Sequence, residues 1–300
     1  MFAILGATGK VGRATIRTLL GQGHAVRAIV RDASRATELA AAGCELAIAH
    51  LGDQAQLAAA FKGAKAVQVI CPVLARGDDA FGEMKGMVDT LTAALAAAGP
   101  PAVVAISDYG AQLSEGTGVT LVFHHLEKRL LTLDTSLTFL RSAEHMQNWG
   151  RHLKYASDTG TLPSMHHPIT KLFPTVSAGD LGVIAADFVT AAAGTSSPRI
   201  VHVEGPRRYT AVDVAEAIGS LVERDVVARE LPRSQWLPTL ALGGLGESYA
   251  KLVVALYDTH NAGQIDVEVG VGEVRHGTTE LRDVLANLPR PGARPSGNHA

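Results

Sequence analysis

Three glycines near the start of the chain have the spacing of a nucleotide-phosphate site. Residues 6–12 read GATGKVG and follow a short apolar run, residues 2–5, so the glycines stand where a first strand turns into a helix. Gly6 supplies a tight turn, Gly9 lets the backbone approach a pyrophosphate, and Gly12 allows close packing of helix on sheet. The helix amino terminus then faces the anion. This context favours a nucleotide cradle over a plain turn, and the expected binding residues are Gly6, Ala7, Thr8, Gly9, Lys10, Val11 and Gly12.

The residue after the second predicted strand indicates which nicotinamide cofactor the cradle holds. NAD-preferring sites place a carboxylate there for the ribose hydroxyl, whereas this chain has Arg31. A guanidinium can pair with the additional phosphate of NADP, with help from Arg35 or the hydroxyl of Ser34. Asp32 leaves two alternatives open, because it can accept the ribose hydroxyl of NAD or cap the helix that follows. We favour the cap, and therefore NADP (NADPH) over NAD.

Proton-transfer groups are harder to find in this sequence. Dehydrogenases of alcohols often use a Tyr-x-x-x-Lys pair, in which the lysine lowers the pKa of the tyrosine, and none of the five tyrosines has a lysine four residues later. Reversible alcohol chemistry therefore lacks its usual acid. Quinone reduction fits better, because a quinone spreads the developing negative charge and needs only a positioned hydride with one hydrogen-bond donor or water.

The candidate donors follow the fifth predicted strand. Ser107, Asp108 and Tyr109 should edge the nicotinamide crevice, where Ser107 would hold a substrate oxygen and Tyr109 would donate a proton. Plain loop hydrogen bonding is the alternative for both. His125 and Lys128 lie one turn apart on the next predicted helix and can face the same crevice, although Lys128 matches an outward position. We take Tyr109, Ser107 and His125 as the catalytic candidates.

The histidines gather in the middle of the chain, at positions 124–125, 145, 152 and 166–167. Adjacent histidines on a helix point about 100 degrees apart, and no pair has the i, i+4 spacing of a helical zinc site with an acidic neighbour. We expect surface or pocket-lining histidines and no metal.

A regular alternation of strands and helices must position these groups. Near-continuous apolar strands separated by amphipathic helices predict a Rossmann-type, doubly wound parallel sheet covered on both faces. The predicted strands are 2–5, 25–30, 45–49, 66–70, 102–106 and 137–140. The predicted helices begin after Gly9 and then cover 33–42, 54–61, 81–98 and 122–133. Asp53 stands where the helix at 54–61 needs an N-cap.

The pattern loosens after residue 142, which predicts three parts. Residues 1–142 form the NAD(P)-binding domain, and 143–288 form a smaller substrate lobe. A strand at 199–203 should return to the sheet, and Thr210 with Asp213 forms a capping pair before a helix. Helices are also predicted at 181–192 and 278–285, and the proline-rich residues 289–300 form a flexible tail.

Composition excludes several classes of protein. The 300 residues carry a formal net charge of −2 and no basic stripe, which argues against nucleic acid and anionic membranes as partners. The apolar stretches are too short and broken to span a membrane. Because the first strand begins at residue 2, we expect no cleavable leader and a cytoplasmic protein with reduced core thiols at Cys44 and Cys71. The sequence is compatible with a homo-oligomer.

At the level of motifs the chain resembles the NmrA-like family of atypical short-chain dehydrogenases, which includes NAD(P)H:quinone oxidoreductases and triphenylmethane reductases. The resemblance rests on the glycine motif, VRD at 30–32, GD at 52–53, LEK at 126–128 leading to LTFLR at 137–141, and QNW at 147–149. It implies a contact of Asp53 near the adenine and a substrate pocket between the looser half and the nicotinamide. A flat apolar aromatic substrate would suit such a pocket. The pocket candidates are Asn148, Trp149, Phe173, Trp236 and Tyr257, with core packing as the alternative for the aromatic residues.

Two functions of different classes follow. The first is an NADPH-dependent oxidoreductase that reduces a quinone-like or conjugated aromatic acceptor. The second is a redox-sensing regulator that binds NAD(P) without turnover and contacts a protein partner, which the missing Tyr-Lys pair permits. A sensor should have a blocked crevice, or one without a donor beside the nicotinamide.

Overall fold

The computed structural model describes residues 1–71, 73–191 and 198–288. Its centre is an eight-stranded sheet in the order β12-β10-β6-β5-β4-β1-β2-β3, in which every neighbouring pair is parallel. Strand order reverses between β1 and β4, so the predicted doubly wound sheet is present. The strands are β1 (Phe2–Leu5), β2 (Val26–Val30), β3 (Glu45–Ile48), β4 (Val67–Ile70), β5 (Ala102–Asp108), β6 (Ser136–Ser142), β10 (Arg199–Glu204) and β12 (Glu273–His276).

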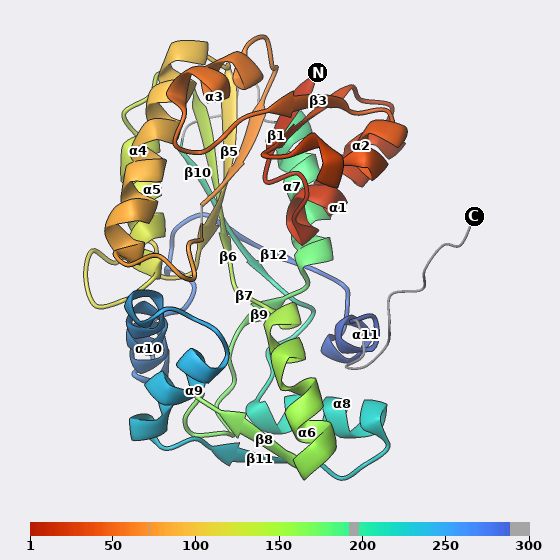
Figure 1. Cartoon of the computed structure of the whole chain (residues 1–300), viewed down its shortest axis with the longest axis vertical. Helices are drawn as coiled ribbons and strands as arrows, with labels where there is room; N and C mark the ends of the chain where they lie inside the picture. Colours follow the sequence, from red (N-terminus) through yellow and green to blue (C-terminus); the bar gives the residue numbers. More distant parts are fainter. Residues whose placement is uncertain (72, 192–197, 289–300) are drawn as a thin grey trace.

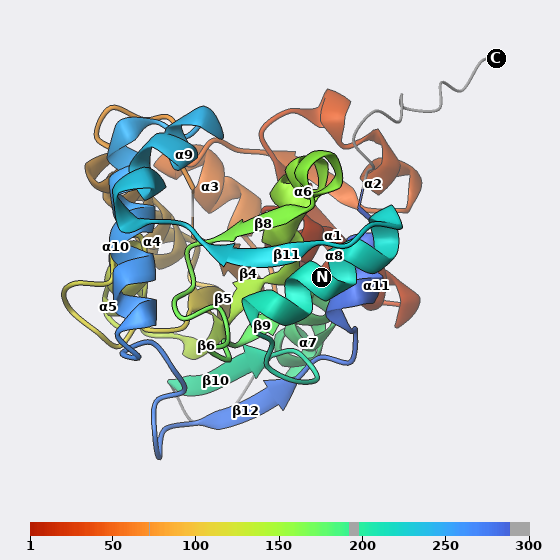
Figure 2. The same ribbon diagram turned by 90° about the horizontal axis from the view of Figure 1, so that it is seen from below.

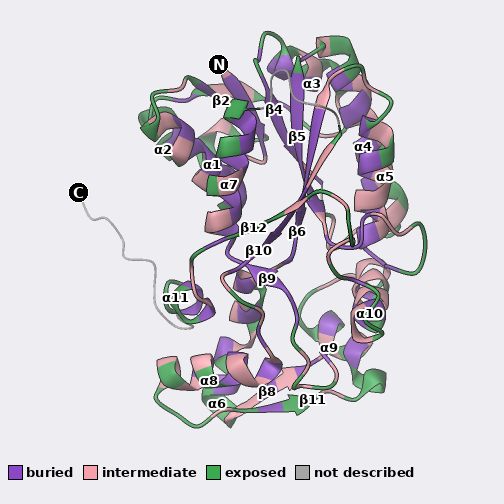
Figure 3. Cartoon of the chain, turned by 180° about the vertical axis from the view of Figure 1, so that it is seen from behind, coloured by how far each residue is buried: buried purple, intermediate pink, exposed green. Residues whose placement is uncertain are grey.

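Helices cover both faces of this sheet (Figure 1). On one face lie α1 (Lys10–Gly21) and α7 (Ala178–Ala191), and on the other lie α3 (Gln54–Phe61), α4 (Ala80–Ala98) and α5 (Thr120–Leu130). The six inner strands are buried along most of their length (Figure 3), which accounts for their apolar sequences, whereas the edge strands β3 and β12 are largely accessible. Each face has its own apolar cluster.

Apart from α7, β10 and β12, the described residues after 142 form a lobe beyond the carboxyl edge of the sheet (Figures 1 and 2). Two small parallel pairs, β7 with β9 and β8 with β11, hold its segments together. Its strands are β7 (Glu144–His145), β8 (Thr161–Ser164), β9 (Thr175–Val176) and β11 (Val227–Glu230). Its helices are η2 (Met146–His152), α6 (Leu153–Thr159), α8 (Ala211–Val222), η3 (Arg233–Gln235), α9 (Trp236–Leu242), α10 (Glu247–Asn261) and α11 (Leu281–Ala286).

Most of the first-half elements lie within two or three residues of the predicted bounds. The predicted helix at 33–42 is wrong, because the segment is a 3-10 turn, η1 (Ala33–Arg35), followed by the short α2 (Thr37–Ala41). Asp32 caps the turn by accepting from the Ser34 amide, and the buried Ala36 has a non-helical φ of −125°. Strand β5 runs two residues further than predicted, so Ser107 and Asp108 belong to the sheet and not to the loop.

The second half was predicted less completely. The returning strand at 199–203 is confirmed as β10, which pairs with β6, and Thr210 and Asp213 form a complete capping box at α8. The helix at 278–285 is shorter than predicted, and β12, α6, α9 and α10 had no predicted counterpart. Ala192 and the tail 289–300 lie outside the described residues. Among the described helices, none combines the length and apolar character needed to cross a bilayer.

Candidate functional site

The glycine loop between β1 and α1 is a cradle in which added side-chain atoms would collide with the backbone. Gly6 has a φ of +74°, and a Cβ at Gly12 would lie 2.4 Å from the Gly6 carbonyl oxygen. Gly9 caps α1 without any side-chain hydrogen bond to the first-turn amides. Exposed amides at a helix amino terminus, reached across a loop without side chains, suit a phosphate group. The residues present therefore fit a dinucleotide.

Predicted cofactor residues surround this cradle. Thr8, Gly9 and Lys10 are exposed while Ala7, Val11 and Gly12 are buried under the loop. Arg31 follows β2 directly, and its exposed side chain has no hydrogen bond or ion pair with a described residue. Arg35 is also exposed on η1.

The two aspartates near these arginines act as caps. Asp32 Oδ1 accepts hydrogen bonds from the Ser34 amide at 2.9 Å and from the Ser34 hydroxyl at 2.7 Å. These hydrogen bonds lower the pKa of Asp32, so its carboxylate is fixed at the turn. Asp53 caps α3 by accepting from the Gln56 amide at 2.9 Å. The cap assigned to Asp32 is therefore present, whereas the exposed Arg31 beside it is not engaged by a described side chain.

A cavity of about 450 Å³ opens at the carboxyl ends of β4, β5 and β6, next to the glycine loop. Ile70 joins the two regions, because it lines the cavity and its Cγ2 would lie 2.7 Å from a Cβ at Gly6. The ends of the three strands supply one wall, and α10 supplies another, partly apolar wall. Its lining includes Cys71, Val73, Asp108, Tyr109, Phe123, Glu144, His145, Asn148, Arg151, Tyr249, Val253, Leu256, Tyr257 and His260.

Glu144, directly after β6, is the centre of a polar network in this cavity. His166 Nε2 donates to Glu144 Oε2 at 3.2 Å, the Tyr257 hydroxyl donates to Oε1 at 3.4 Å, and Arg151 lies 3.9 Å from Oε1. Burial works against its charge, but the hydrogen bond from His166 and the nearby positive groups lower the pKa of Glu144 to about 2. The cavity therefore contains a carboxylate that stays ionised at neutral pH.

Asp108, the last residue of β5, is a second carboxyl group in the cavity and behaves in the opposite way. Thr120 Oγ1 donates to Asp108 Oδ2 at 2.5 Å. Burial, together with the charges of Glu144 and Glu127, raises the pKa of Asp108 to about 7 although the Thr120 hydrogen bond opposes the shift. Two carboxyl groups with pKa values driven apart in one cavity are a common feature of sites that carry out acid and base chemistry.

The structure places the predicted catalytic residues in different surroundings. The Ser107 hydroxyl donates to Glu127 Oε1 at 2.6 Å, and Arg141 holds the same carboxylate. Tyr109 lines the cavity, but its ring is 2% exposed and meets His202 edge on. Burial, and then the charge of Glu204, raises the pKa of its hydroxyl far above the usual range.

The third catalytic candidate does not reach the cavity. His125 Nε2 contacts Asp89 Oδ1 of α4 at 2.9 Å, between two helices, and His125 is not among the residues that line the cavity. Lys128 is exposed on the same helix, as expected.

Of the predicted substrate residues, Asn148 and Tyr257 line the cavity and three aromatic residues form the layer behind it. Phe173 stacks on His166 with ring centroids 3.9 Å apart, and Trp149 stacks on both rings. Trp236 meets Tyr257 edge on and donates its indole N–H to the Leu231 carbonyl oxygen. Trp149 and Phe173 therefore pack against His166, the partner of the cavity-lining Glu144, and Trp236 packs against the cavity-lining Tyr257.

Several cavity residues were missed at the sequence level. Glu144 could have been found from its position after β6, because polar residues at the carboxyl end of a parallel strand face the ligand crevice. Tyr249 and His260 gave no such signal, since the sequence did not predict α10. In the described part of the chain, no group of three or more His, Cys, Asp or Glu residues is arranged to hold a metal ion.

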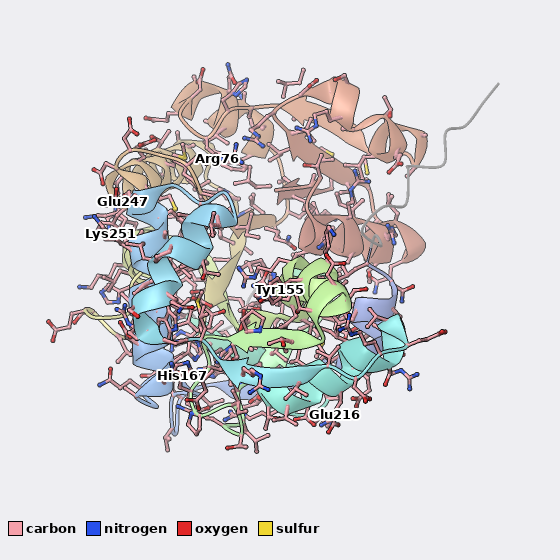
Figure 4. The ribbon with its side chains drawn as sticks, turned by 60° about the horizontal axis from the view of Figure 1, so that its bottom comes forward. Arg76, Tyr155, His167, Glu216, Glu247 and Lys251 are labelled. Carbon is pink, nitrogen blue, oxygen red and sulfur yellow. The ribbon has the colours of Figure 1, made fainter. Side chains whose placement is uncertain are left out.

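The loop after β4 connects the sheet to the lobe across one side of the cavity. Arg76 Nε donates to the Gly244 carbonyl oxygen at 3.1 Å, and the Gly246 amide donates to the Ala75 carbonyl oxygen at 2.7 Å. Figure 4 shows Arg76 on the same side of the molecule as Glu247 and Lys251 of α10. Segments that are 168 residues apart in sequence, at Arg76 and Gly244, thus meet beside the cavity.

Comparison with known proteins gives matches over most of the chain. Residues 6–147 match the model of a family described as NAD(P)H-binding. An NAD(P)H azoreductase from Xenophilus azovorans is 24% identical over 258 residues, 86% of each chain. Quinone oxidoreductase 2 from Escherichia coli strain K12 is 24% identical, with 96% of this chain and 98% of the relative covered. Citrobacter sp. triphenylmethane reductase complexed with NADP(H) superposes with a TM-score of 0.79 at 20% identity, over 95% of this chain and 99% of that one.

Proposed function

Because residues 6–147 belong to the NAD(P)H-binding family and the chain has the fold of the NmrA-like atypical short-chain dehydrogenases, we propose that this NAD(P)H-dependent oxidoreductase uses NADPH to reduce a quinone-like or other conjugated aromatic acceptor. The observation that carries the proposal is the position of the cavity. It lies beside the glycine loop, at the carboxyl edge where doubly wound sheets bind their ligands.

The residues around the glycine loop provide a site for the cofactor. The loop backbone and the first turn of α1 would hold the pyrophosphate, and Arg31 and Arg35 would meet the ribose phosphate that distinguishes NADP from NAD. When bound, NADPH supplies a hydride to the acceptor. Lys10 extends the positive charge of this region toward the cavity, because its charge contributes to the lowered pKa of His145.

The cavity suits a flat conjugated ring. Its volume of about 450 Å³ lies in the range of small-molecule sites, about 300–1,000 Å³. Val253 and Leu256 offer apolar surface, Tyr249 and Tyr257 offer aromatic surface, and the Asn148 amide can donate to a carbonyl oxygen. The names of the similar proteins describe acceptors of this kind, namely azo compounds, quinones and triphenylmethane dyes.

The open cavity also separates the enzyme from the sensor hypothesis. A protein that only senses the cofactor has no use for a cavity of this volume beside the nicotinamide end of the site. Here that space is lined by titratable groups with perturbed pKa values, which is typical of a site where chemistry occurs.

The test is oxidation of NADPH by the purified protein, followed by the loss of reduced-nicotinamide absorbance, with and without a panel of quinones and conjugated aromatic acceptors. NADPH, NADH and NADP⁺ are titrated in parallel by protein fluorescence. We expect acceptor-dependent oxidation and tighter binding of NADPH than of NADH. Tight binding with no oxidation by any acceptor would replace the enzyme with the sensor.

A further inference from the structure

Reduction of a quinone needs a proton as well as a hydride. We propose that Asp108 is the general acid that delivers this proton to the acceptor oxygen, an inference that rests on the proposed function. The quinone gains two electrons and one hydrogen as hydride, and one of its oxygens becomes an anion. That oxygen then forms an O–H bond as the O–H bond of the Asp108 carboxyl breaks. The carboxylate regains its proton from water.

The position of Asp108 in the sheet brings it to the reacting edge. It ends β5, the strand between β4 and β6, and pairs in register with Ser142. The cavity is lined by Asp108 and by residues that follow both neighbouring strands. The Thr120 hydroxyl fixes Oδ2 from α5. A carboxyl group held at one oxygen by a rigid helix has a defined direction for transfer.

Three of the neighbouring groups are already engaged elsewhere. The Ser107 hydroxyl donates to Glu127, and His125 contacts Asp89 away from the cavity. Glu144 is ionised and holds the Tyr257 hydroxyl as its donor. Asp108 is thus the one carboxyl group lining the cavity, among the described residues, whose surroundings favour the protonated form.

Ionisable groups on β7, on α5, on α10 and directly after β4 lie near Asp108. The Glu144 carboxylate on β7 and the Glu127 carboxylate on α5 disfavour a further negative charge, and burial acts in the same direction. The Cys71 thiol after β4 and the Tyr249 hydroxyl on α10 lie close enough for the Asp108 charge to raise their pKa values. Both stay neutral at ordinary pH. The carboxyl pKa of about 7 matches an acid that works near neutrality, the condition that maximises general acid catalysis.

The chemistry of the acceptor gives a discriminating experiment. A cationic triarylmethane dye gains hydride on carbon and becomes neutral, so it needs no proton, whereas a quinone needs one. We expect Asp108→Asn to lower quinone turnover by about 100-fold or more. The same variant should retain reduction of the dye within a few-fold, and its NADPH affinity should match the wild type in a fluorescence titration.

Two further variants move the pH profile in opposite directions. Quinone turnover by the wild type should fall as pH rises through about 7, because the carboxyl loses its proton. Glu144→Gln removes a charge that raises the Asp108 pKa, so this fall should occur at lower pH. Thr120→Val removes a hydrogen bond that lowers the pKa, so the fall should move to higher pH. If Asp108 had a purely structural role, neither variant would shift the pH at which quinone turnover falls.

The titration of Asp108 can also be read without cofactor or substrate. Its raised pKa means that the folded protein loses stability as pH rises from about 4 to about 7, since the unfolded chain gives up the proton more easily. The Tm of Asp108→Asn minus that of the wild type should therefore increase over this range. The exposed Asp78→Asn is the matched control, and its difference should stay flat.

The outcomes are separable. If none of the acceptors supports NADPH oxidation by the wild type, the proposed function itself is contradicted. A wild type that reduces quinones, with an Asp108→Asn variant that keeps this activity or loses quinone and dye reduction equally, overturns the assignment of Asp108. If the dye is not a substrate, or if Asp108→Asn does not fold, the pH profiles decide. Opposite shifts in the pH at which quinone turnover falls, in Glu144→Gln and Thr120→Val, support the assignment of Asp108. Unshifted profiles overturn it.

Discussion

At the carboxyl edge of β1 and β2 the functional groups are backbone amides and exposed cations, whereas at the edge of β4, β5 and β6 they are partly buried side chains that act on one another. Arg31 has no side-chain hydrogen bond or ion pair with a described residue, and Arg35 acts on Asp32 only through its charge, but Glu144 contacts four polar side chains. The first region is complete when an anionic ligand supplies the missing charge. The second sets its own charges before any ligand arrives.

This difference has a physical origin. A phosphate site needs close backbone approach and positive charge, which glycines and a helix terminus supply over a few residues. An acceptor site needs groups with defined protonation states, which burial and neighbouring charges must set. Its residues therefore come from β4, β5, β6, β7, α5 and α10, and the charge of Glu144 adds to burial in raising the pKa of Asp108.

The largest effect on NADPH binding is expected from a substitution in the glycine loop, where the backbone leaves no room for an added side-chain atom. In Gly12→Ala the added Cβ would lie 2.4 Å from the Gly6 carbonyl oxygen, so the loop must move. Overpacking against backbone costs up to about 3 kcal/mol, which predicts about 100-fold weaker NADPH binding in a fluorescence titration. Gly21→Ala, at the other end of α1 with nothing within 4 Å, is the control and should bind normally. Equal affinities for both variants would remove the loop from the cofactor site.

Cofactor preference tests whether the exposed cations are recognition groups. Arg31→Glu should weaken NADPH by about 1 to 3 kcal/mol more than NADH, because a charge-assisted contact becomes a repulsion. Arg17→Glu makes the same charge change on an exposed position of α1 and should leave the NADPH to NADH ratio unchanged. An equal loss for both nucleotides in Arg31→Glu would sink the role of Arg31 at the ribose phosphate.

Stability against pH tests the self-contained charge of the second region. The lowered pKa of Glu144 stabilises the fold above about pH 4.5, and this contribution is lost as pH falls toward about 2. Glu144→Gln should therefore cost about 1 to 2 kcal/mol in the free energy of unfolding at neutral pH, with a gap that narrows below about pH 4.5. Glu216→Gln, at an exposed position of α8 (Figure 4), serves as the control in urea unfolding. If the difference in unfolding free energy between the wild type and Glu144→Gln did not change with pH, an ionised Glu144 would be contradicted.

The smallest effect separates Tyr109 from its neighbour Asp108. With Asp108 as the acid, Tyr109→Phe should change quinone turnover by less than about three-fold, since the ring packing against His202 is preserved. Steady-state kinetics at neutral pH measure this directly. A loss of turnover comparable to that of Asp108→Asn would return the proton-transfer role to Tyr109.

The sequence predicted the two regions to different depths for the same physical reason. The glycine loop, the Asp32 cap and strands β1 to β6 depend on local spacing, and the structure places them close to the predicted bounds. The cavity depends on contacts between distant segments, such as Glu144 with Tyr257, which are 113 residues apart. Ser107 and Tyr109 were chosen for their chemistry, but the partners that engage them, Glu127 and His202, could not be inferred from position alone.

We expect the two regions to act together, with the glycine loop holding NADPH and the cavity at the ends of β4, β5 and β6 holding the acceptor. The most direct test is a single turnover in which NADPH-loaded protein is mixed with one equivalent of a quinone in a stopped-flow instrument. We expect loss of the reduced-nicotinamide absorbance in proportion to the quinone added, and no such loss with Gly12→Ala at the same concentrations. Constant absorbance with fully bound NADPH and every acceptor tried would contradict it.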